Sequence, residues 1–243
     1  MNPETDLRTE LHERGLNRDG SKQTLNRRLF MQLQVFGGCP NADGLVSDFK
    51  ASGLEGVVYR DVNDPRGVGI LTVSEDPALF VTRLRDLLNT GPFLELTQKP
   101  EYTMLGRSYA AGYEQDLEDW LLSKPRRTAF NPEWPWAIWY PLRRTGTFAK
   151  LPHQEQGAIL REHGMIGKAY GEADLAHDIR LACHGLDAHD NEFVIGLVGR
   201  ELYPLSHVVQ SMRKTRQTAE YIQAMGPFFI GHALWQSPAP QNP

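Results

Sequence analysis

One histidine stands out as a candidate metal ligand. His163 lies in a segment, 152–170, whose apolar residues recur at helical spacing, with Ile166 on the same side of the expected helix. Gly164 and Gly167 are expected on that face as well, although glycine lowers helix stability by roughly 1 kcal/mol against alanine. Two glycines beside a neutral imidazole suit the approach of a flat ligand such as an iron porphyrin. A histidine hydrogen-bonded within the core explains the same pattern, and the pattern alone favours it.

A second polar pattern lies on the strand expected at 175–184. Alternate residues of a strand point to opposite faces, so Asp178 and Arg180 share one face while Ile179 lies on the other. Charged residues in the middle of a strand need either solvent or a polar cavity around them. A solvated sheet face and the distal side of a ligand pocket are therefore both consistent with this strand.

An aromatic strand is expected at 136–142, and two arginines follow it. Tyr140 lies on one face of the strand, and Arg143 and Arg144 come directly after its end. A guanidinium group binds carboxylates, such as haem propionates, through paired hydrogen bonds. A tyrosine close to an iron porphyrin can also be redox-active. Without further context, an aromatic core strand with a solvated basic end is the simpler interpretation.

Several common chemistries lack their motifs in this sequence. There is no phosphate-binding P-loop, no GxGxxG after a strand and no GxSxG nucleophile motif. Cys39 and Cys183 form no CxxC pair, which excludes a disulfide framework and the common zinc ribbons. The remaining candidates for a zinc site match no familiar ligand spacing: His177, His184 and His189.

The composition is that of an ordinary globular protein of 243 residues, with 40% hydrophobic and 23% charged residues. A net charge of −4 argues against a general nucleic-acid binder, which usually carries a basic excess. No apolar stretch approaches the ~20 residues of a membrane-spanning helix, and the acidic N-terminus does not resemble a secretory signal. We therefore expect a cytoplasmic protein with no nucleic-acid partner and no membrane span.

The elements that must position these residues occur in the same order twice. In the first half we expect strands at 29–36, 56–62, 67–74 and 93–97, with helices at 41–52 and 76–88. In the second half we expect strands at 136–142, 175–184, 192–198 and 228–234, with helices at 152–170 and around 205–212. The order is βαββαβ in each half. We predict an α+β fold of two ferredoxin-like repeats packed sheet to sheet, of the dimeric α+β barrel type.

The expected domain division follows from this repeat. It comprises a polar N-terminal arm at 1–27, an N-terminal ferredoxin-like domain at 28–120, a linker at 121–134, a C-terminal ferredoxin-like domain at 135–237 and a disordered tail at 238–243.

Short motifs in the second half make the sequence similar to a known family. They are Trp139-Tyr140-Pro141-Leu142, Glu162-His163-Gly164-Met165-Ile166-Gly167, Gly185-Leu186-Asp187 and Gly226-Pro227-Phe228-Phe229-Ile230-Gly231. In this order they resemble the chlorite dismutase-like family, which includes the coproheme decarboxylases, over roughly residues 100–235. The first half matches the family by its order of elements more than by motifs.

The resemblance implies a homopentamer that binds haem b or coproheme in its C-terminal half. His163 stands where the family places the proximal iron ligand, beside Gly167. Tyr140 stands where decarboxylating members carry the tyrosine that becomes a radical and oxidises propionates. Arg144 falls where those members carry a lysine near a propionate, and Lys168 falls where an arginine is common. Together with Arg143, these cations are the expected partners of the porphyrin carboxylates.

The distal position departs from the family pattern. Counting back from the Gly-Leu-Asp motif places Asp178 there, whereas chlorite dismutases carry arginine and many decarboxylases carry glutamine. Arg180 points to the same face and could take that role. Three functions therefore stay open. They are a peroxide-dependent coproheme decarboxylase of haem b biosynthesis, which we favour, a chlorite dismutase that forms chloride and dioxygen, and a haem-binding protein with weak peroxidase activity or none.

Overall fold

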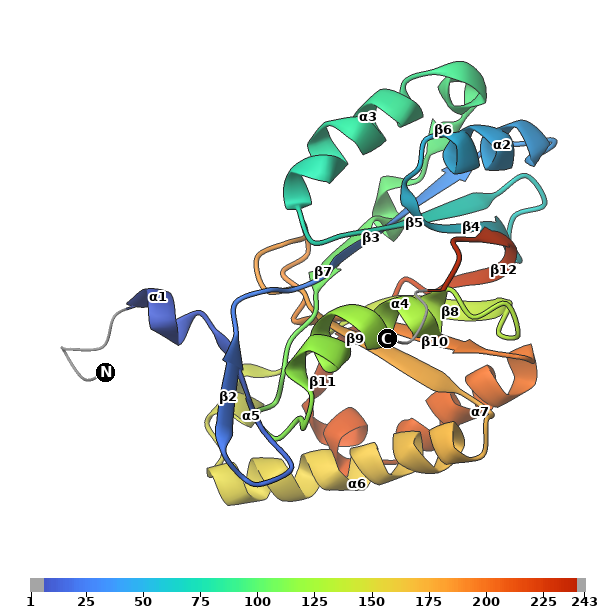
Figure 1. The fold of residues 1–243 in the computed structure, drawn as a ribbon. Helices are drawn as coiled ribbons and strands as arrows, with labels where there is room; N and C mark the ends of the chain where they lie inside the picture. The colour runs from blue at the N-terminus through green and yellow to red at the C-terminus, as the bar shows by residue number, and fades with distance from the viewer. Residues whose placement is uncertain (1–6, 240–243) are drawn as a thin grey trace.

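Two βαββαβ halves follow each other along the chain in the computed structural model, which describes residues 7–239 (Figure 1). The first half contains strands β3 (Phe30–Gly37), β4 (Glu55–Asp61), β5 (Val68–Ser74), β6 (Thr97–Gln98) and β7 (Met104–Arg107), with helices α2 (Asp43–Ala51) and α3 (Arg83–Leu88). The second half contains strands β8 (Trp136–Arg144), β9 (His177–Ala182), β10 (Phe193–Gly199), β11 (Ile222–Met225) and β12 (Phe229–Gln236), with helices α5 (Gly146–Ala149), α6 (His153–Glu172) and α7 (Leu202–Met212).

Shorter elements complete the chain. They are α1 (Leu7–Glu10), β1 (Glu13–Leu16), β2 (Lys22–Leu25), α4 (Lys124–Ala129), 3₁₀ turns at Pro77–Val81, Gly91–Glu95 and Pro100–Tyr102, and π-helical turns at Asp119–Ser123 and Gln217–Tyr221. No helix within residues 7–239 has the length and apolar character needed to cross a membrane.

The strands close into a barrel. The first half contributes the order β7-β3-β5-β4, and the second half contributes β12-β8-β10-β9, with every pair antiparallel. Strand β4 pairs with β12, and β7 meets β9 at Arg107 and Ala182, so the two sheets are hydrogen-bonded at both edges. The predicted α+β fold of two ferredoxin-like repeats is confirmed, with the sheets joined edge to edge around a common interior.

The interior of the barrel is filled by alternate side chains of its strands. Met31, Leu33 and Trp139 belong to this interior core and are at most 1% exposed. Gly196 of β10 lies opposite Trp139 on β8, and a Cβ atom on Gly196 would lie 2.6 Å from the indole ring. This position therefore needs glycine because the neighbouring ring occupies the space that a side chain would fill.

The outer faces of the barrel are covered by helices (Figure 1). Helix α2 places Leu45 and Phe49 in an apolar cluster on the outer face of the first half. Helix α7 places Leu205 and Val208 in a second cluster on the outer face of the second half, together with outward-facing residues of β8 and β10. Helix α6 also lies on this second face, and the candidate site forms beneath it.

The segment between the two halves packs as part of the core. The sequence predicts a linker at 121–134, with a helix in the Asp-Leu-Glu-Asp-Trp-Leu-Leu stretch that leads into it. The structure has a π-helical turn there followed by α4, and Leu121, Leu122 and Phe130 are buried in the interior core. These side chains cover one region of the barrel interior. Their burial removes apolar surface from water and so stabilises the short helix in this position.

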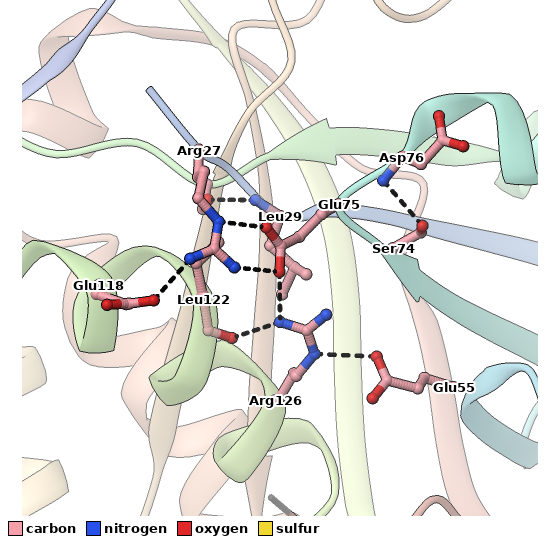
Figure 2. A network of polar contacts seen from close by, with 10 residues as sticks. Arg27, Leu29, Glu55, Ser74, Glu75, Asp76, Glu118, Leu122 and Arg126 are labelled. Atoms are coloured by element: carbon pink, nitrogen blue, oxygen red, sulfur yellow. Dashed lines mark hydrogen bonds and ion pairs between the residues drawn. The ribbon is translucent and has the colours of Figure 1, made fainter. Parts of the chain in front are cut away.

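A network of ion pairs ties this segment to the first half (Figure 2). Arg126 of α4 donates to Glu55 of β4 at 3.0 Å and to the carbonyl of Leu122 at 3.1 Å. Arg27 donates to Glu75 and to Glu118 at 2.9 and 2.6 Å. Most of these side chains are partly exposed, so each pair contributes little by itself and the network mainly fixes the register of the segment.

The N-terminal arm contains a β-hairpin bound to the same segment. Strands β1 and β2 pair with each other, and the Leu16 amide and the Gln23 side chain both donate to the carbonyl of Glu114, at 3.0 and 2.9 Å. The carboxylate of Glu13 accepts a hydrogen bond from the Ala110 amide at 2.9 Å. The outer ends of the predicted arm and tail, 1–6 and 240–243, lie outside the described residues.

One strand lies elsewhere than predicted. The sequence places the last strand of the first half at 93–97, but Phe93 sits in a 3₁₀ turn and only Thr97 belongs to a strand, the short β6, which pairs with the end of β3. The longer pairing with β3 is made by β7 (Met104–Arg107). The turn begins at Gly91 and contains Pro92, which cannot donate to a sheet, and Phe93 is buried in the helix-side cluster of the first half. The apolar character of Phe93 thus reflects burial against helices.

Candidate functional site

The site is built on the outer face of the second half's sheet. Cross-strand register places Tyr140 of β8 beside Ile195 of β10, and Ile195 beside Arg180 of β9. These three residues form one row, and they share a face because directly opposed residues point the same way. Asp178 lies two residues before Arg180 and points to this face as well. The structure therefore brings together the three sheet residues predicted for catalysis.

Tyr140 lies deep in this face. Its side chain is 6% exposed, and its ring stacks on Phe228 with the ring centres 4.6 Å apart. Burial raises the pKa of the Tyr140 phenol far above its ordinary value, and the negative charge of Asp178 raises it further, against the opposing charge of Arg213. The phenol is therefore protonated throughout the physiological range of pH.

Helix α6 directs one stripe of side chains toward this face. Ile159 is its one fully buried residue, while His163, Ile166, Gly167 and Tyr170 follow at helical spacing and are half-buried. Gly164 falls outside the stripe, contrary to the prediction, and a Cβ atom there would meet nothing within 4 Å. A 20-residue helix with a single buried residue packs only loosely on its own sheet.

The His163 imidazole faces the sheet row. Burial lowers the pKa of His163, the positive charge of Arg180 lowers it further, and the negative charge of Asp178 acts in the opposite direction. Both charges therefore lie close enough to His163 to influence its protonation. The ring nitrogen Nδ1 lies 3.3 Å from Oγ1 of Thr215, and Nε2 has no hydrogen-bond partner in the described part of the chain. The imidazole is neutral at physiological pH, with one nitrogen unengaged.

Arg180 and Asp178 form an ion pair at the edge of this face. Nε of Arg180 lies 2.8 Å from a carboxylate oxygen of Asp178, and each side chain is 42% exposed. A cleft opens beside the pair, under the segment that joins the two halves. Its walls include Trp120 and Lys124, with the Lys124 ammonium 3.9 Å and the Arg180 guanidinium 5.5 Å from the Trp120 ring centre. The charged pair is thus partly open to solvent.

The predicted carboxylate-binding cations lie in three different places. Arg144 shares the face of Tyr140, and its guanidinium lies over Phe148 while Nε donates to Glu192 at 2.9 Å. Arg143 points to the opposite face of the strand and donates to the carbonyl of His189 at 2.9 Å. Its Nε atom is buried without a hydrogen-bond partner in the described chain.

Lys168 lies apart from the other predicted residues. Its side chain is 74% exposed, and its ammonium lies 3.5 Å from Glu172 on the outer side of α6. It is five residues beyond His163, which turns it well away from the inward stripe. Gly167, in contrast, is on the stripe, where a Cβ atom would lie 3.4 Å from Met212 of α7.

The comparisons with known proteins agree with this architecture. A family model described as chlorite dismutase matches residues 70–234, which is more than half of the chain. The chain belongs to the chlorite dismutase-like family. A haem-binding protein from Thermus thermophilus has a similar structure, with 19% identity, a TM-score of 0.68, and coverage of 86% of this chain and 92% of that chain.

Chlorite dismutase from Candidatus Nitrospira defluvii, solved in complex with imidazole, is also similar. It is 15% identical, with a TM-score of 0.66, and the match covers 86% of this chain and 92% of that chain. At these identities the two solved structures show that this chain shares their fold.

The residues around His163 fit the iron of a porphyrin, the group that the family resemblance implies. The half-buried imidazole has Nδ1 held by Thr215 and Nε2 unengaged, which is the donor that a haem iron requires. Within residues 7–239 no group of three or more histidine, cysteine, aspartate or glutamate side chains could hold a metal ion. In this fit His163 would be the residue that holds the iron, with the porphyrin nitrogens supplying further ligands.

Three residues of the site were missed from sequence. Thr215 lies in the turn after α7, and nothing in its neighbours marks it as a partner of His163. The sequence assigns Trp120 only to a helix, and its position against Arg180 depends on how the segment between the halves folds back over β9. Phe228 belongs to a motif, but its stacking on Tyr140 follows from strand pairing that is distant in sequence.

Proposed function

We propose that this chain is a haem-dependent oxidoreductase that uses peroxide to decarboxylate coproheme on the way to haem b. The observation that supports this best is one arrangement. An imidazole with a free Nε2 faces a sheet row that carries a buried, protonated phenol and a guanidinium–carboxylate pair. A haem protein that oxidises a group on its own porphyrin needs such an axial ligand and a buried redox-active residue.

In this proposal His163 holds the iron through Nε2, with Nδ1 retained by Thr215. The bound iron porphyrin supplies the oxidising power when it reacts with peroxide. Tyr140 would give up the hydrogen atom of its phenol to that oxidant and regain one from the β-carbon of a nearby propionate. A second electron would pass from this carbon to the same oxidant, so that the carboxylate leaves as carbon dioxide and a vinyl group remains, with one peroxide consumed for each propionate. The burial of Tyr140 protects such a radical from solvent, and its raised pKa keeps the hydrogen in place beforehand.

Arginines position the carboxylates of the substrate. Arg144 lies on the Tyr140 face, and Glu192 engages its Nε atom, leaving the terminal nitrogens for a propionate. Arg143, with its buried unpartnered Nε, points to the opposite face of the strand, and Lys168 lies on the outer side of α6, so both side chains would need a changed position to contribute. Asp178 and Arg180, beside the cleft, place the peroxide.

The proposal is tested by adding coproheme to the purified protein and then hydrogen peroxide. Mass spectrometry of the extracted porphyrin should show the successive loss of two propionate carboxyl groups. His163→Ala should lose porphyrin binding, whereas Tyr140→Phe should retain it and stop the decarboxylation. Binding of coproheme by His163→Ala with an unchanged absorption spectrum would contradict the assignment of the iron ligand.

Chlorite dismutation is a second candidate, because Arg180 lies in the same row as Tyr140. A positive charge on this face could retain a chlorine oxyanion, but Asp178 neutralises much of it at 2.8 Å. Release of dioxygen from chlorite by the haem-loaded protein, lost in Arg180→Gln and increased in Asp178→Asn, would support this function. Stable haem that reacts with neither peroxide nor chlorite would instead support a haem-binding role.

We further propose that the protein is a homo-oligomer, with the pentamer of the family resemblance as the expected state. Helix α6 carries exposed apolar side chains at Leu160 and Met165, 42% and 61% exposed, which suit contact with another molecule. Sedimentation velocity of the purified protein measures the subunit number directly, and a monomer at micromolar concentration would contradict this expectation.

A further inference from the structure

The one hydrogen bond of the His163 ring runs to a buried hydroxyl. Nδ1 lies 3.3 Å from Oγ1 of Thr215, which stands in the turn three residues after the end of α7. Thr215 is 2% exposed, so no solvent competes for its hydroxyl. A buried partner on the ring nitrogen that faces away from a ligand normally decides which nitrogen carries the proton.

The direction of this hydrogen bond follows from the other contacts of Thr215. A hydroxyl has a single proton, and Oγ1 of Thr215 donates it to the carbonyl of Met212 at 2.8 Å. A carbonyl oxygen can only accept, so this proton is committed unless it turns to Thr218, whose Oγ1 lies at 3.3 Å. Toward His163 the hydroxyl oxygen therefore accepts, and Nδ1 of His163 must be the donor.

We propose that Thr215 is a positioning residue that holds His163 in the tautomer protonated on Nδ1. The lone pair is thereby left on Nε2, the nitrogen that would bind iron. This inference rests on the proposed role of His163 as axial ligand, but it concerns a property that the protein has before any porphyrin binds.

The chemical nature of the acceptor matters as much as its position. The neighbouring carboxylate of Glu162 is engaged by the backbone amide of Arg216 at 3.0 Å, and no carboxylate among the described residues lies within hydrogen-bond distance of Nδ1. An uncharged hydroxyl draws the Nδ1 proton less strongly than a carboxylate would. The axial imidazole is thus kept neutral and only moderately electron-donating, which favours a higher reduction potential for the iron than a carboxylate partner would give.

The first test uses the protein without porphyrin. In ¹⁵N NMR spectra of histidine-labelled protein, the His163 signals, assigned by comparison with His163→Gln, should show a proton on Nδ1 and none on Nε2. Thr215→Ser keeps the hydroxyl and should keep this pattern. Thr215→Val removes it while preserving the shape of the side chain, and should shift His163 toward the Nε2–H tautomer.

Thr218→Val is the matched control, because Thr218 contacts the hydroxyl of Thr215 but has no hydrogen bond to His163. It should leave the His163 tautomer unchanged, since Thr215 still donates to Met212. An Nδ1–H tautomer that persists in folded Thr215→Val, as judged from an otherwise preserved spectrum, would overturn the proposal.

The second test uses coproheme-loaded protein. Loss of the hydrogen-bond partner behind a metal ligand typically weakens metal binding about 10–100-fold, so Thr215→Val should bind coproheme at least about 10-fold more weakly. The iron–histidine vibration of the ferrous form, seen by resonance Raman spectroscopy, should shift in Thr215→Val and not in Thr215→Ser.

The two proposals fail separately. Should His163→Ala bind coproheme like the unmodified protein, the proposed function is wrong although the tautomer result stands. Should His163→Ala lose the porphyrin while Thr215→Val changes neither tautomer, affinity nor vibration, only the role of Thr215 is refuted.

Discussion

Replacing Tyr140 by phenylalanine separates the chemistry of the site from its packing. The phenol ring is 6% exposed and stacked on Phe228 at 4.6 Å, and phenylalanine keeps both the burial and the stacking. The hydroxyl has no hydrogen-bond partner among the described residues, so its loss leaves no buried group unsatisfied. The free energy of unfolding should therefore change by less than about 1 kcal/mol, the typical net value of one hydrogen bond.

The matched variant is Tyr140→Ala, which removes the ring itself. Deletion of a buried aromatic side chain typically costs about 3–5 kcal/mol, because both the transfer energy and the contacts around the cavity are lost. Urea denaturation of the two variants measures this difference. We expect Tyr140→Phe to bind coproheme with an unchanged affinity and spectrum, and to yield no decarboxylated porphyrin after peroxide addition.

Two results would refute the reasoning behind this prediction. Normal product formation by Tyr140→Phe would show that no oxidation passes through the phenol. A loss of several kcal/mol in the same variant would show that the hydroxyl has a buried partner, so that a missing product could reflect damage to the fold. Porphyrin binding measured in parallel distinguishes these cases, since only the second should weaken it.

Further predictions concern residues that stabilise the fold around the candidate site. Gly196→Ala should destabilise the barrel by about 1–3 kcal/mol, because its new methyl group would lie 2.6 Å from the Trp139 ring. Gly157→Ala, in open space on α6, should instead stabilise the protein by up to about 1 kcal/mol. Thermal denaturation of both variants measures the two changes in stability. Although burial raises the pKa of the Asp187 carboxyl, hydrogen bonds from Asn191 outweigh it and hold that pKa below its ordinary value. Asp187→Asn should thus cost about 1–3 kcal/mol at neutral pH. This deficit should shrink as the pH falls below about 4, where the carboxyl of the unfolded chain takes up a proton, and should vanish once the pH is below the lowered native pKa; equal urea midpoints for the two proteins at neutral pH would contradict it.

Much of the fold could be predicted because each half repeats the same local signals. The alternation in β8 and β10 and the apolar stripe of α7 are encoded within ten or so residues, and the structure shows these elements close to the expected positions. The strand expected at 93–97 was misplaced, since a short apolar stretch such as that around Phe93 looks alike whether it is buried by a helix or by a sheet. The edge-to-edge closure of the barrel depends on pairs such as β4 with β12, which are too distant in sequence for local patterns to indicate.

The candidate site, like the fold, could be predicted from the sequence only in part. Strand alternation correctly placed Asp178 and Arg180 on one face, and the row that Arg180 forms with Tyr140 follows from register. The partner of His163 could not be foreseen, because Thr215 reaches it from a turn more than fifty residues away in the chain. Lys168 was selected by family position alone, and only helical geometry in the folded chain shows that it lies on the exposed side of α6.

A comparison of the two halves suggests why only the second would hold a porphyrin. In the first half, α2 buries Leu45 and Phe49 against an outer sheet face that carries Val58, so apolar contacts fill the space between helix and sheet. The equivalent helix of the second half, α6, is more than twice as long and buries only Ile159, and it faces a row that contains Arg180. Packing α6 directly against this sheet face would add little stability, because the free-energy cost of burying the guanidinium exceeds the gain from the few apolar contacts. A flat ligand with an apolar body and carboxylate edges would satisfy both surfaces at once. The repeat thus provides the same scaffold twice, and in the proposed function the polar residues on one copy would turn a packing interface into a binding site.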